Sequence, residues 1–356
     1  MSLVEIVEGA FVLAPELRGD LAARAAALAS RAEAIRLSMP GADVVQGGST
    51  LLVLTRDPTA LRRAASVSPP PLPETRHHEI EVDYDGPDLP ELRESSGLSV
   101  EAVADLHAGP IYTALVCGFL PGFAYLGEVA PPLVRPRLPS PRKRVAPGAV
   151  GVAGKLTGVY PFASPGGWRW IGSARDPRLF DPSRDPPRRI AVLDTVRFAR
   201  APGPPDVPPR PPEEIPKPVD AALGVGRVAP IATGQDLGRS GRRGEGIPAS
   251  GALDPETLAA ANLAVGNPRG AAAIEIFSGS FRATVLRDVL VSIDGHPAAA
   301  LRRGDPLEVP ATDRAVRYLA LRGGIAAPLV LGSRATLAVA SLGGHSGRAF
   351  ARGDEI

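Results

Sequence analysis

Apolar positions recur at helical spacing in the first 40 residues of the chain. The positions that are three or four residues apart are Leu17, Leu21, Ala25, Leu28, Ala32 and Ile35. This spacing places them on one face of an amphipathic helix. The run VVQGGSTLLVLT at 44–55 has the apolar and β-branched character of strands, and Asp57 followed by Pro58 is typical of a second helix start. The pattern predicts a small α/β domain over residues 1–75.

Between residues 76 and 201 the pattern changes to short alternating runs separated by Gly and Pro. Runs such as VAPGAVGVA and RRIAVLDTVRF have the length and composition of strands. One helix is predicted, from Ser99 as its N-cap to His107. Val100, Val103 and His107 fall on one face of it. The repeated short strands indicate an antiparallel β-barrel.

A proline-rich segment at 202–218 separates the two halves of the chain. Nine of its 17 positions are Pro, which predicts a semi-rigid spacer of up to about 50 Å at roughly 3.1 Å per residue. In residues 219–356, Asp254 and Pro255 begin a helix that ends at Gly266, and VLVSI, AVRYLALR and ATLAVA are strand-like. The predicted fold class is therefore mainly β, with an α+β N-terminal part.

Residues 118–172 carry the pattern that is most suggestive of a binding site. They contain GFLPGFAYLG, PRLPSPRKRVAPG and GKLTGVYPFASPGGWRWIG, in which Gly and Pro fix the backbone. Seven of the chain's 16 aromatic residues lie here. Aromatic walls beside backbone N–H groups describe a pocket for a small polar ligand. The predicted substrate-binding residues are Phe119, Pro121, Gly122, Tyr125, Tyr160, Ser164, Gly166, Gly167 and Trp168.

Backbone donors and one lysine are the candidates for chemistry in this stretch. Consecutive N–H groups at Gly166, Gly167 and Trp168 can form an oxyanion hole, and a tight hairpin that only turns the chain is the alternative. Lys155 can place an ammonium group over a carboxylate or phosphate, whereas the Pro-Arg-Lys-Arg run at 141–144 is more typical of a solvated loop.

Three further polar residues have both a functional and a structural interpretation. His107 is a weaker acid–base candidate, because a histidine on an apolar helix face is more often a hydrogen-bonded core residue. Asp236 could form a local salt bridge with Arg239. Glu275 lies inside an apolar strand pattern and either faces solvent or is a tuned carboxylate.

Composition excludes several classes of function. Forty basic residues against 38 acidic ones leave no strongly basic face for nucleic acid. One cysteine and five scattered histidines argue against a disulfide framework and a metal site. No apolar run approaches the roughly 20 residues of a membrane span, and the N-terminus is acidic where a signal peptide is basic. We expect a cytoplasmic protein without a P-loop, a nucleophile elbow or a dinucleotide fingerprint.

The glycine-rich pieces, with IEVDYDGPDLPEL at 80–92 and LSVEAVADLH at 98–107 before them, also carry a family resemblance. In this order they resemble the B component of bacterial 5-oxoprolinase, a family also called allophanate hydrolase subunit 1, which includes the kinase inhibitor KipI. The run QDLGRSGRRGEGIPASGALDPETLAAANLAVGN at 235–267 resembles the opening of the C component, the KipA or allophanate hydrolase subunit 2 family. The chain is similar to a fusion of the two components.

The resemblance implies a cyclophilin-like β-barrel at 76–201 and a KipA-like β domain at 219–356. The second domain would be incomplete, because in that family the chain runs on for about as much again. The implied activity is ATP-dependent hydrolysis of the lactam 5-oxoproline to glutamate, together with a LamB/YcsF-type subunit. ATP would be held with that partner. The resemblance also implies a second cleft lined by Gln235, Arg239, Ser250 and Asn262.

Two other functions stay open at this point. The same pair of domains resembles the biotin-dependent carboxyltransferase part of urea carboxylase, and a glycine-rich aromatic slot suits biotin's flat ureido ring. The chain contains no biotin-attachment sequence, so a biotin carrier would be a partner. The third possibility is a non-catalytic regulator of a sensor histidine kinase, as KipI is.

Overall fold

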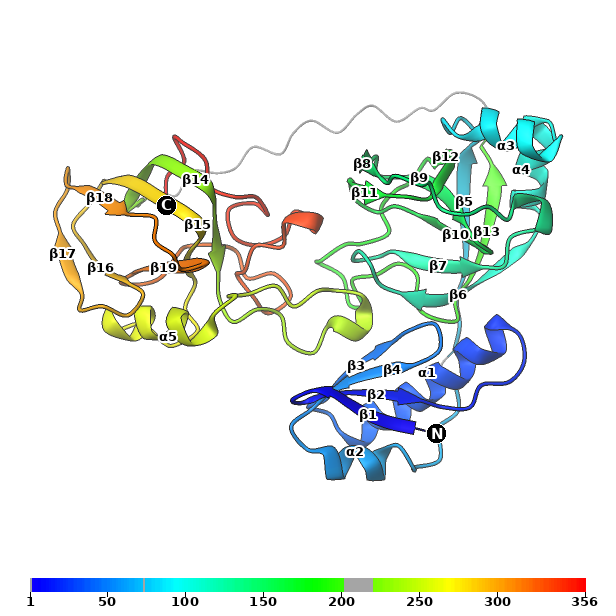
Figure 1. Ribbon diagram of the computed structural model, residues 1–356, viewed down its shortest axis with the longest axis horizontal. Helices are drawn as coiled ribbons and strands as arrows, with labels where there is room; N and C mark the ends of the chain where they lie inside the picture. The colour runs from blue at the N-terminus through cyan, green and yellow to red at the C-terminus, as the bar shows by residue number, and fades with distance from the viewer. Residues whose placement is uncertain (1, 73, 202–219) are drawn as a thin grey trace. The chain divides into compact units, whose positions relative to one another are not determined.

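The computed structural model describes three segments, residues 2–72, 74–201 and 220–356. The predicted proline-rich spacer at 202–218 lies outside these described residues. Contacts divide the described chain into two compact units, whose elements are labelled in Figure 1. The first unit holds the described residues up to 201 and, in addition, residues 240–248. The second unit holds residues 220–239 and 249–356.

The N-terminal part of the first unit is an antiparallel sheet with two helices. Its elements are β1 (Ser2–Val7), β2 (Ala10–Ala14), α1 (Leu21–Ser38), β3 (Asp43–Gln46), β4 (Leu51–Leu54) and α2 (Pro58–Ala64). The strands follow the order β1-β2-β4-β3. The predicted apolar stripe forms the buried face of α1, where Leu28, Ala32 and Ile35 are enclosed. Leu17 precedes the helix, which begins after its N-cap, Asp20.

The rest of the first unit is built on a closed β-barrel. Its strands are β5 (His77–Asp83), β6 (Ile111–Cys117), β7 (Ala124–Gly127), β8 (Arg142–Val145), β9 (Ala149–Ala153), β10 (Leu156–Val159), β11 (Ser164–Gly166), β12 (Arg169–Ala174) and β13 (Thr195–Arg200). Seven strands close the barrel in the order β10-β7-β6-β13-β5-β12-β9, and β8 pairs with β11 separately. The predicted barrel is confirmed, but it is not wholly antiparallel, because β5 and β13 run parallel. Local alternation cannot reveal the direction of a partner strand so distant in the sequence.

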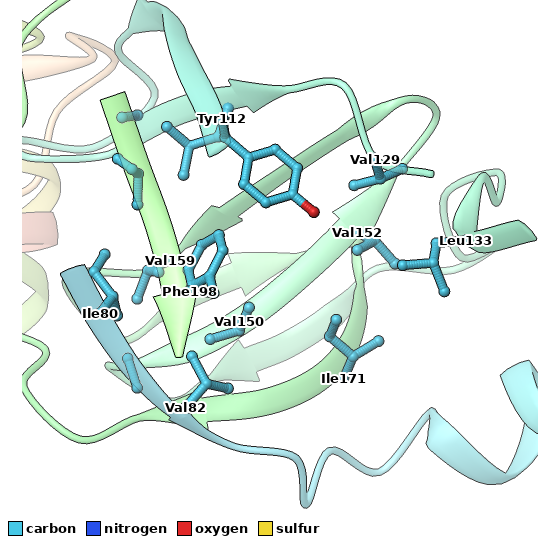
Figure 2. Close-up of a cluster of buried hydrophobic side chains, with 14 of the residues drawn as sticks. Ile80, Val82, Tyr112, Val129, Leu133, Val150, Val152, Val159, Ile171 and Phe198 are labelled. Atoms are coloured by element: carbon cyan, nitrogen blue, oxygen red, sulfur yellow. The ribbon is translucent and has the colours of Figure 1, made fainter. Parts of the chain in front are cut away.

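Branched and aromatic side chains fill the barrel (Figure 2). Alternate residues of a strand point to the same face, so Ile80 and Val82 of β5 both enter this core, as do Val150 and Val152 of β9. Phe198 of β13 lies among them and is fully buried. The alternation in the sequence therefore specifies the barrel interior.

Three short helices accompany the barrel. They are α3 (Leu89–Ser96), α4 (Val100–Ala108) and the 3-10 turn η1 (Pro131–Leu133). Helix α4 is the one predicted, with the Ser99 side chain accepting from the Ala102 N–H at 3.1 Å. Helix α3 was not predicted, because it has only eight residues and its N-cap, Asp88, makes no side-chain capping bond.

One buried side chain ties the N-terminal sheet to the barrel. The amide nitrogen of Gln46 donates to the carbonyl oxygens of Ala25 at 3.2 Å and Leu115 at 3.1 Å. Ala25 and Leu115 also pack together with Leu193 in a small apolar cluster. These contacts join α1, β3 and β6 within the first unit.

The second unit is a six-stranded antiparallel sheet with one α-helix. Its elements are β14 (Leu223–Gln235), α5 (Pro255–Ala264), β15 (Ala273–Val285), β16 (Val289–Ile293), β17 (Ala299–Leu301), β18 (Pro306–Val309), β19 (Val316–Leu321) and η3 (Ala338–Ala340). The order is β14-β15-β19-β16-β17, and β18 pairs with β15. The capped helix at Asp254 and the strands at VLVSI and AVRYLALR are confirmed.

The predicted strand ATLAVA at 335–340 is wrong. The segment is a loop that ends in the 3-10 turn η3, although Ala335, Thr336 and Ala340 are buried. The carbonyl oxygens of Ala335 and Thr336 accept hydrogen bonds from the side chains of Arg239 and Ser250. Distant polar side chains therefore satisfy these two carbonyls, while the Thr336 N–H donates to the Gly234 carbonyl of β14 at 2.9 Å. Among the described helices, none has the length and apolar character required to cross a bilayer.

Candidate functional site

Five aromatic rings from the predicted pocket form one cluster in the first unit. Phe123 lies at its centre, with ring centroids 5.0 Å from Tyr125, 5.4 Å from Tyr160 and 5.5 Å from Trp168. Phe119 lies 5.6 Å from Phe123 and 6.2 Å from Tyr160. All of these pairs meet at steep angles, the edge-to-face geometry that aromatic rings favour. The aromatic residues of this stretch therefore lie together in the structure, as the predicted aromatic wall requires.

The glycines around the cluster make room for the rings. A Cβ atom on Gly158 of β10 would lie 2.8 Å from the Ala124 carbonyl oxygen and 3.1 Å from the Phe123 ring. One on Gly166 of β11 would lie 2.6 Å from the Tyr160 hydroxyl. Space for aromatic side chains thus explains the need for glycine at both positions.

The structure changes the predicted oxyanion hole at residues 166–168. A backbone hydrogen bond of Trp168 partly offsets the raised pKa of the Tyr160 hydroxyl, and the Gly167 carbonyl accepts from the Leu138 N–H at 2.7 Å. With its oxygen occupied as an acceptor, Tyr160 keeps its own O–H as a donor. Burial raises the pKa values of Tyr160 and Tyr125, so both hydroxyls stay protonated at neutral pH.

Two arginines place positive charge beside these tyrosines. The charge of Arg137 partly offsets the raised pKa values of both Tyr125 and Tyr160. Arg137 is exposed, and its guanidinium group makes no hydrogen bond or ion pair with the described residues. Arg142 binds Asp88 at 2.5 Å through Nη2, while its buried Nη1 has no partner among the described residues. A cation beside an aromatic wall suits an anionic ligand.

Sequence reasoning missed Arg137 and Asp88. Asp88 is buried and accepts from Arg142 and from the Trp170 N–H at 2.7 Å, so it orients one face of the region. The Leu138 N–H holds the segment of Arg137 against Gly167, so the charge of Arg137 acts on both tyrosines. Arg137 has no sequence signal beyond its place in the glycine-rich stretch, and Asp88 has none beyond its place in the motif at 80–92.

Phe119 and Gly122 lie in the loop between β6 and β7, on either side of Pro121. Phe119 has 53% of its surface exposed and a φ of 74°, a left-handed conformation that is strained for an aromatic residue. Gly122 has a φ of 82°, and a Cβ there would lie 2.7 Å from the Leu179 carbonyl oxygen. The loop is therefore held in a shape that presents the Phe119 ring to solvent. Ser164, nearby in β11, is buried, and its hydroxyl has no partner among the described residues.

The two predicted catalytic residues have other partners in the structure. Lys155 precedes β10 and Tyr160 follows it, so they lie roughly 16 Å apart along an extended chain. The Lys155 side chain is 64% exposed and pairs with Glu128 at 3.2 Å. The ammonium group of Lys155 is therefore paired with Glu128, and its predicted joint role with the N–H groups of residues 166–168 stays a prediction.

His107 occupies the barrel core. It is fully buried, with Nδ1 2.8 Å from the Tyr84 hydroxyl and Nε2 2.8 Å from the Thr157 hydroxyl. Desolvation lowers the pKa of His107 to about 3. The structure therefore supports the core interpretation of this residue, since both ring nitrogens are occupied and no ligand can reach them without opening the barrel.

In the second unit, three of the four predicted cleft residues converge on the loop at 335–336. The amide nitrogen of Gln235 donates to the Thr336 carbonyl oxygen at 3.3 Å, and Ser250 donates to the same oxygen at 2.5 Å. Arg239 is 1% exposed and donates to the carbonyl of Ala335 at 2.7 Å, while its Nη1 has no partner among the described residues. Burial lowers the pKa of Arg239.

Asn262 does not belong to this group. It binds the Ala271 carbonyl at 2.7 Å and Asn267 at 3.1 Å, which fixes the end of α5. Asp236 accepts from Ser333 at 2.7 Å and from the Arg334 N–H at 2.6 Å, in place of the predicted bond to Arg239.

Glu275 also has a structural role. It accepts from the Tyr318 hydroxyl at 2.7 Å and from the Leu253 N–H at 2.8 Å. The side chain that periodicity left undecided therefore links β15, β19 and the segment before α5.

A cleft of about 880 Å³ adjoins the loop at 335–336 in the second unit. Its lining includes Arg322, Arg334, Gly344 and His345. Gly344 packs against Thr336, where a Cβ would lie 1.9 Å from the threonine hydroxyl. The polar group around Arg239 therefore supports one wall of an open cleft whose lining carries both basic and acidic side chains. Among the described residues, no three His, Cys, Asp or Glu side chains are grouped to hold a metal.

The two halves of the chain match the two parts of one known domain type. Residues 5–190 match the family described as carboxyltransferase domain, subdomain C and D, and residues 245–356 match carboxyltransferase domain, subdomain A and B. The chain therefore belongs to the carboxyltransferase domain family.

Particular relatives of this family resemble each half separately. The B component of 5-oxoprolinase from Escherichia coli O157:H7 is 40% identical over 167 residues, 44% of this chain and 76% of that protein. The C component of 5-oxoprolinase from Escherichia coli K12 is 34% identical over 145 residues, 36% of this chain and 47% of that protein. The chain spans about half the length of this second relative. Urea amidolyase from Lachancea kluyveri is 35% identical over 134 residues, 33% of this chain and 7% of that enzyme.

A solved structure matches nearly the whole chain. The crystal structure of a protein designated TTHA0988 has a TM-score of 0.80 and 35% sequence identity, covering 97% of this chain and 74% of that one. The two carboxyltransferase parts are thus joined in one polypeptide in TTHA0988 as they are in this chain.

Proposed function

We propose that this chain is a fused B and C component of a 5-oxoprolinase-type lactam hydrolase. The observation that carries the proposal is the order of the two matches. A relative of the B type at 40% identity covers part of the first half, and a relative of the C type at 34% identity covers part of the second. One polypeptide would then supply what those relatives supply as two.

The proposed reaction opens the lactam ring of 5-oxoproline with the help of ATP. The lactam oxygen takes the terminal phosphoryl group of ATP, and ADP is released. One water adds to the activated carbon, and the C–N bond breaks as the nitrogen takes a proton, which leaves an acyl phosphate. A second water hydrolyses this acyl phosphate to glutamate and inorganic phosphate. A LamB/YcsF-type subunit would be the partner that completes the ATP-dependent step. This polypeptide would bind substrate and stabilise negative charge.

The aromatic cluster with Arg137 has the chemistry to bind such a substrate. The exposed Arg137 guanidinium can pair with the substrate carboxylate, and the exposed Phe119 ring can cover its flat lactam. A protonated tyrosine hydroxyl, from Tyr125 or Tyr160, can donate to the lactam oxygen. The strained backbone of Phe119 supports this assignment, because strained residues that the surrounding structure holds in place cluster at binding and active sites.

A coupled assay tests the proposed reaction. The full chain is mixed with a LamB/YcsF-type subunit from the same genome, and glutamate release from 5-oxoproline is followed with and without ATP. Glutamate formed only when both proteins and ATP are present is the expected result. No glutamate from two folded proteins, with a known active oxoprolinase as a positive control, would refute the proposal.

The role of Arg137 is tested in the same assay by Arg137→Ala. We expect KM for 5-oxoproline to rise by about tenfold with little change in kcat, because the charge contributes to binding in ground and transition states alike. Lys143→Ala is the matched control, since Lys143 is exposed on the neighbouring strand β8. An equal rise in KM for both variants would show a general charge effect and remove Arg137 from the site.

Carboxyl transfer from biotin is the second candidate, and the family description favours it. Both halves match carboxyltransferase subdomains, and urea amidolyase is among the relatives. The test is binding of free biotin, followed by the fluorescence of Trp168 and Trp170, the chain's two tryptophans. Saturable quenching that Tyr125→Phe weakens would favour carboxyl transfer, and no quenching in an otherwise active oxoprolinase would exclude biotin at this cluster.

A further inference from the structure

The first unit contains a polar cleft that shares no residue with the aromatic cluster. It has a volume of about 380 Å³ and is lined from both the N-terminal sheet and the barrel. Asp43 begins β3, and Arg188 lies in the loop before β13. The segment at 241–245, which belongs to the first unit, forms the remaining wall.

Close contacts fix the wall made by this segment. A Cβ on Gly244 would lie 2.5 Å from the Val44 carbonyl oxygen and 3.0 Å from Arg36 Nη2. Arg36 Nη2 itself donates to the Val44 carbonyl at 3.0 Å. Arg243, in the 3-10 turn η2 (Arg243–Glu245), binds Asp43 Oδ2 at 2.8 Å. The cleft is therefore bounded by specific packing against the edge of β3.

Most charges around the cleft are paired with one another. Arg36 pairs with Glu33 at 3.4 Å, and Arg242 pairs with Glu245 at 3.1 Å. Arg188 differs, because no described carboxylate lies within ion-pair distance of it. Its Nε and Nη1 atoms are buried and have no hydrogen-bond partner among the described residues.

An unused acceptor lies in the same lining. Asp43 has 7% of its surface exposed, and its buried Oδ1 atom has no partner in the described chain, although Oδ2 binds Arg243. A buried donor or acceptor without a partner is unfavourable. Two residues of the cleft lining, Arg188 and Asp43, therefore have buried polar atoms without partners, and an occupant toward which these side chains turn would satisfy both.

We propose that this cleft binds a small amino-acid zwitterion, with its carboxylate on Arg188 and its ammonium group on Asp43. A simple anion would leave Asp43 Oδ1 without a partner, and a simple cation would leave the Arg188 donors without one. A molecule with both charges close together satisfies both residues at once. The guanidinium fork matches the two oxygens of a carboxylate. This site is additional to the proposed lactam site, and its test requires no turnover.

The test measures binding to the full chain by isothermal titration calorimetry. The probes are glycine and L-glutamate, with sodium acetate and methylammonium chloride as probes that carry one charge each. We expect the amino acids to bind and the two singly charged probes to bind at least about tenfold more weakly, because each leaves one buried group unpaired. No binding of either amino acid would overturn the proposal and leave water as the occupant.

Two variants assign the binding to the cleft. Arg188→Gln is expected to weaken amino-acid binding by about tenfold or more, and Asp43→Asn to remove the preference for glycine over acetate. Arg184→Gln is the matched control, since Arg184 is an exposed residue of the same loop and does not line the cleft. Thermal unfolding of each variant checks folding, and Arg188→Lys replaces Arg188→Gln if the latter unfolds.

A different pattern in the variants would contradict the proposal. Amino-acid binding that survives both Arg188→Gln and Asp43→Asn in folded protein would place the zwitterion elsewhere on the chain. Binding lost equally in Arg184→Gln would show a general dependence on surface charge. Acetate that binds as tightly as glycine would make the cleft an anion site and refute the role of Asp43.

Discussion

At the scale of single residues, polar groups in the barrel core are held neutral by their surroundings. His107 lies between the Tyr84 and Thr157 hydroxyls, each 2.8 Å from a ring nitrogen. Its ring also packs 4.5 Å from Phe198. A charged imidazolium would have no solvent and no described carboxylate beside it there, so the neutral form is strongly favoured.

This burial predicts a pH dependence of stability. The pKa of His107 is lowered from 6.5 to about 3 by desolvation, so the unfolded chain takes up a proton below pH 6.5 that the folded chain does not. The contribution of neutral His107 to stability is complete above pH 6.5 and falls as the pH drops, by about 1.4 kcal/mol per pH unit for one proton. Urea unfolding at pH 7 and pH 5, followed by tryptophan fluorescence, measures the loss as about 2 kcal/mol.

His107→Gln serves as the comparison for that experiment. Glutamine keeps one donor and one acceptor but does not titrate, so the difference between pH 7 and pH 5 should shrink by most of that amount. Both tryptophans, Trp168 and Trp170, lie in the first unit and report its unfolding. An unchanged pH dependence in the variant would assign the effect to other groups.

Gly158 gives a second prediction at this scale. An alanine Cβ there would lie 2.8 Å from the Ala124 carbonyl, a backbone atom that cannot rotate away. We expect Gly158→Ala to lower the unfolding free energy by about 1–3 kcal/mol, as overpacking of a core does. Gly167→Ala is the control, because its nearest neighbouring atom is 3.7 Å away, and it should stay within about 0.5 kcal/mol of the parent. If both variants lose the same unfolding free energy, the atoms around Gly158 move to accommodate the added Cβ and the predicted crowding does not destabilise the protein.

At the scale of elements, helix starts could be predicted because a cap is a local interaction. Asp57, Ser99 and Asp254 each accept a backbone N–H three residues further on, at 2.7, 3.1 and 3.1 Å. The segment at 335–340 could not be judged in this way, since its carbonyls bind the Arg239 and Ser250 side chains from far along the chain. In the sequence, a buried loop of apolar residues looks the same as a strand.

The candidate site was predictable to the same limited extent. The grouping of aromatics follows from their density in residues 118–172, but the position of the cation Arg137 depends on a contact between Leu138 and Gly167. Lys155 was the cation that the sequence favoured, and the length of β10 separates it from Tyr160. Which cation meets which ring is a tertiary property that local pattern does not contain.

The cap of α5 provides a prediction for one element. Asp254 accepts from the Thr257 N–H at 3.1 Å and from its hydroxyl at 2.5 Å. Asp254→Ala should lower the unfolding free energy of the second unit by about 1 kcal/mol, the usual effect of removing an N-cap. Far-UV circular dichroism during urea unfolding measures it. Glu256→Ala is the control from the same turn, and a loss as large as that of Asp254→Ala would argue against capping as the cause.

At the scale of the whole molecule, each unit has a core of its own. Phe198 is fully buried in the barrel cluster of the first unit, and Phe281 is fully buried in the sheet cluster of the second. The segment at 240–248 belongs to the first unit because Gly244 and Gly246 pack against Val44 and Gly118. The sequence pattern had assigned this segment to the second half, since nothing local in it signals the contact.

Separate cores predict that damage to one unit stays in that unit. Phe281→Ala removes a large buried side chain from the second core and should destabilise it by about 3–5 kcal/mol. Both tryptophans lie in the first unit, so tryptophan fluorescence should unfold at the urea concentration of the parent while circular dichroism shows an earlier transition. Phe198→Ala should produce the converse result, with fluorescence lost first. If Phe281→Ala shifts both signals together by the same amount, the two units unfold as one cooperative structure and their cores are not energetically separate.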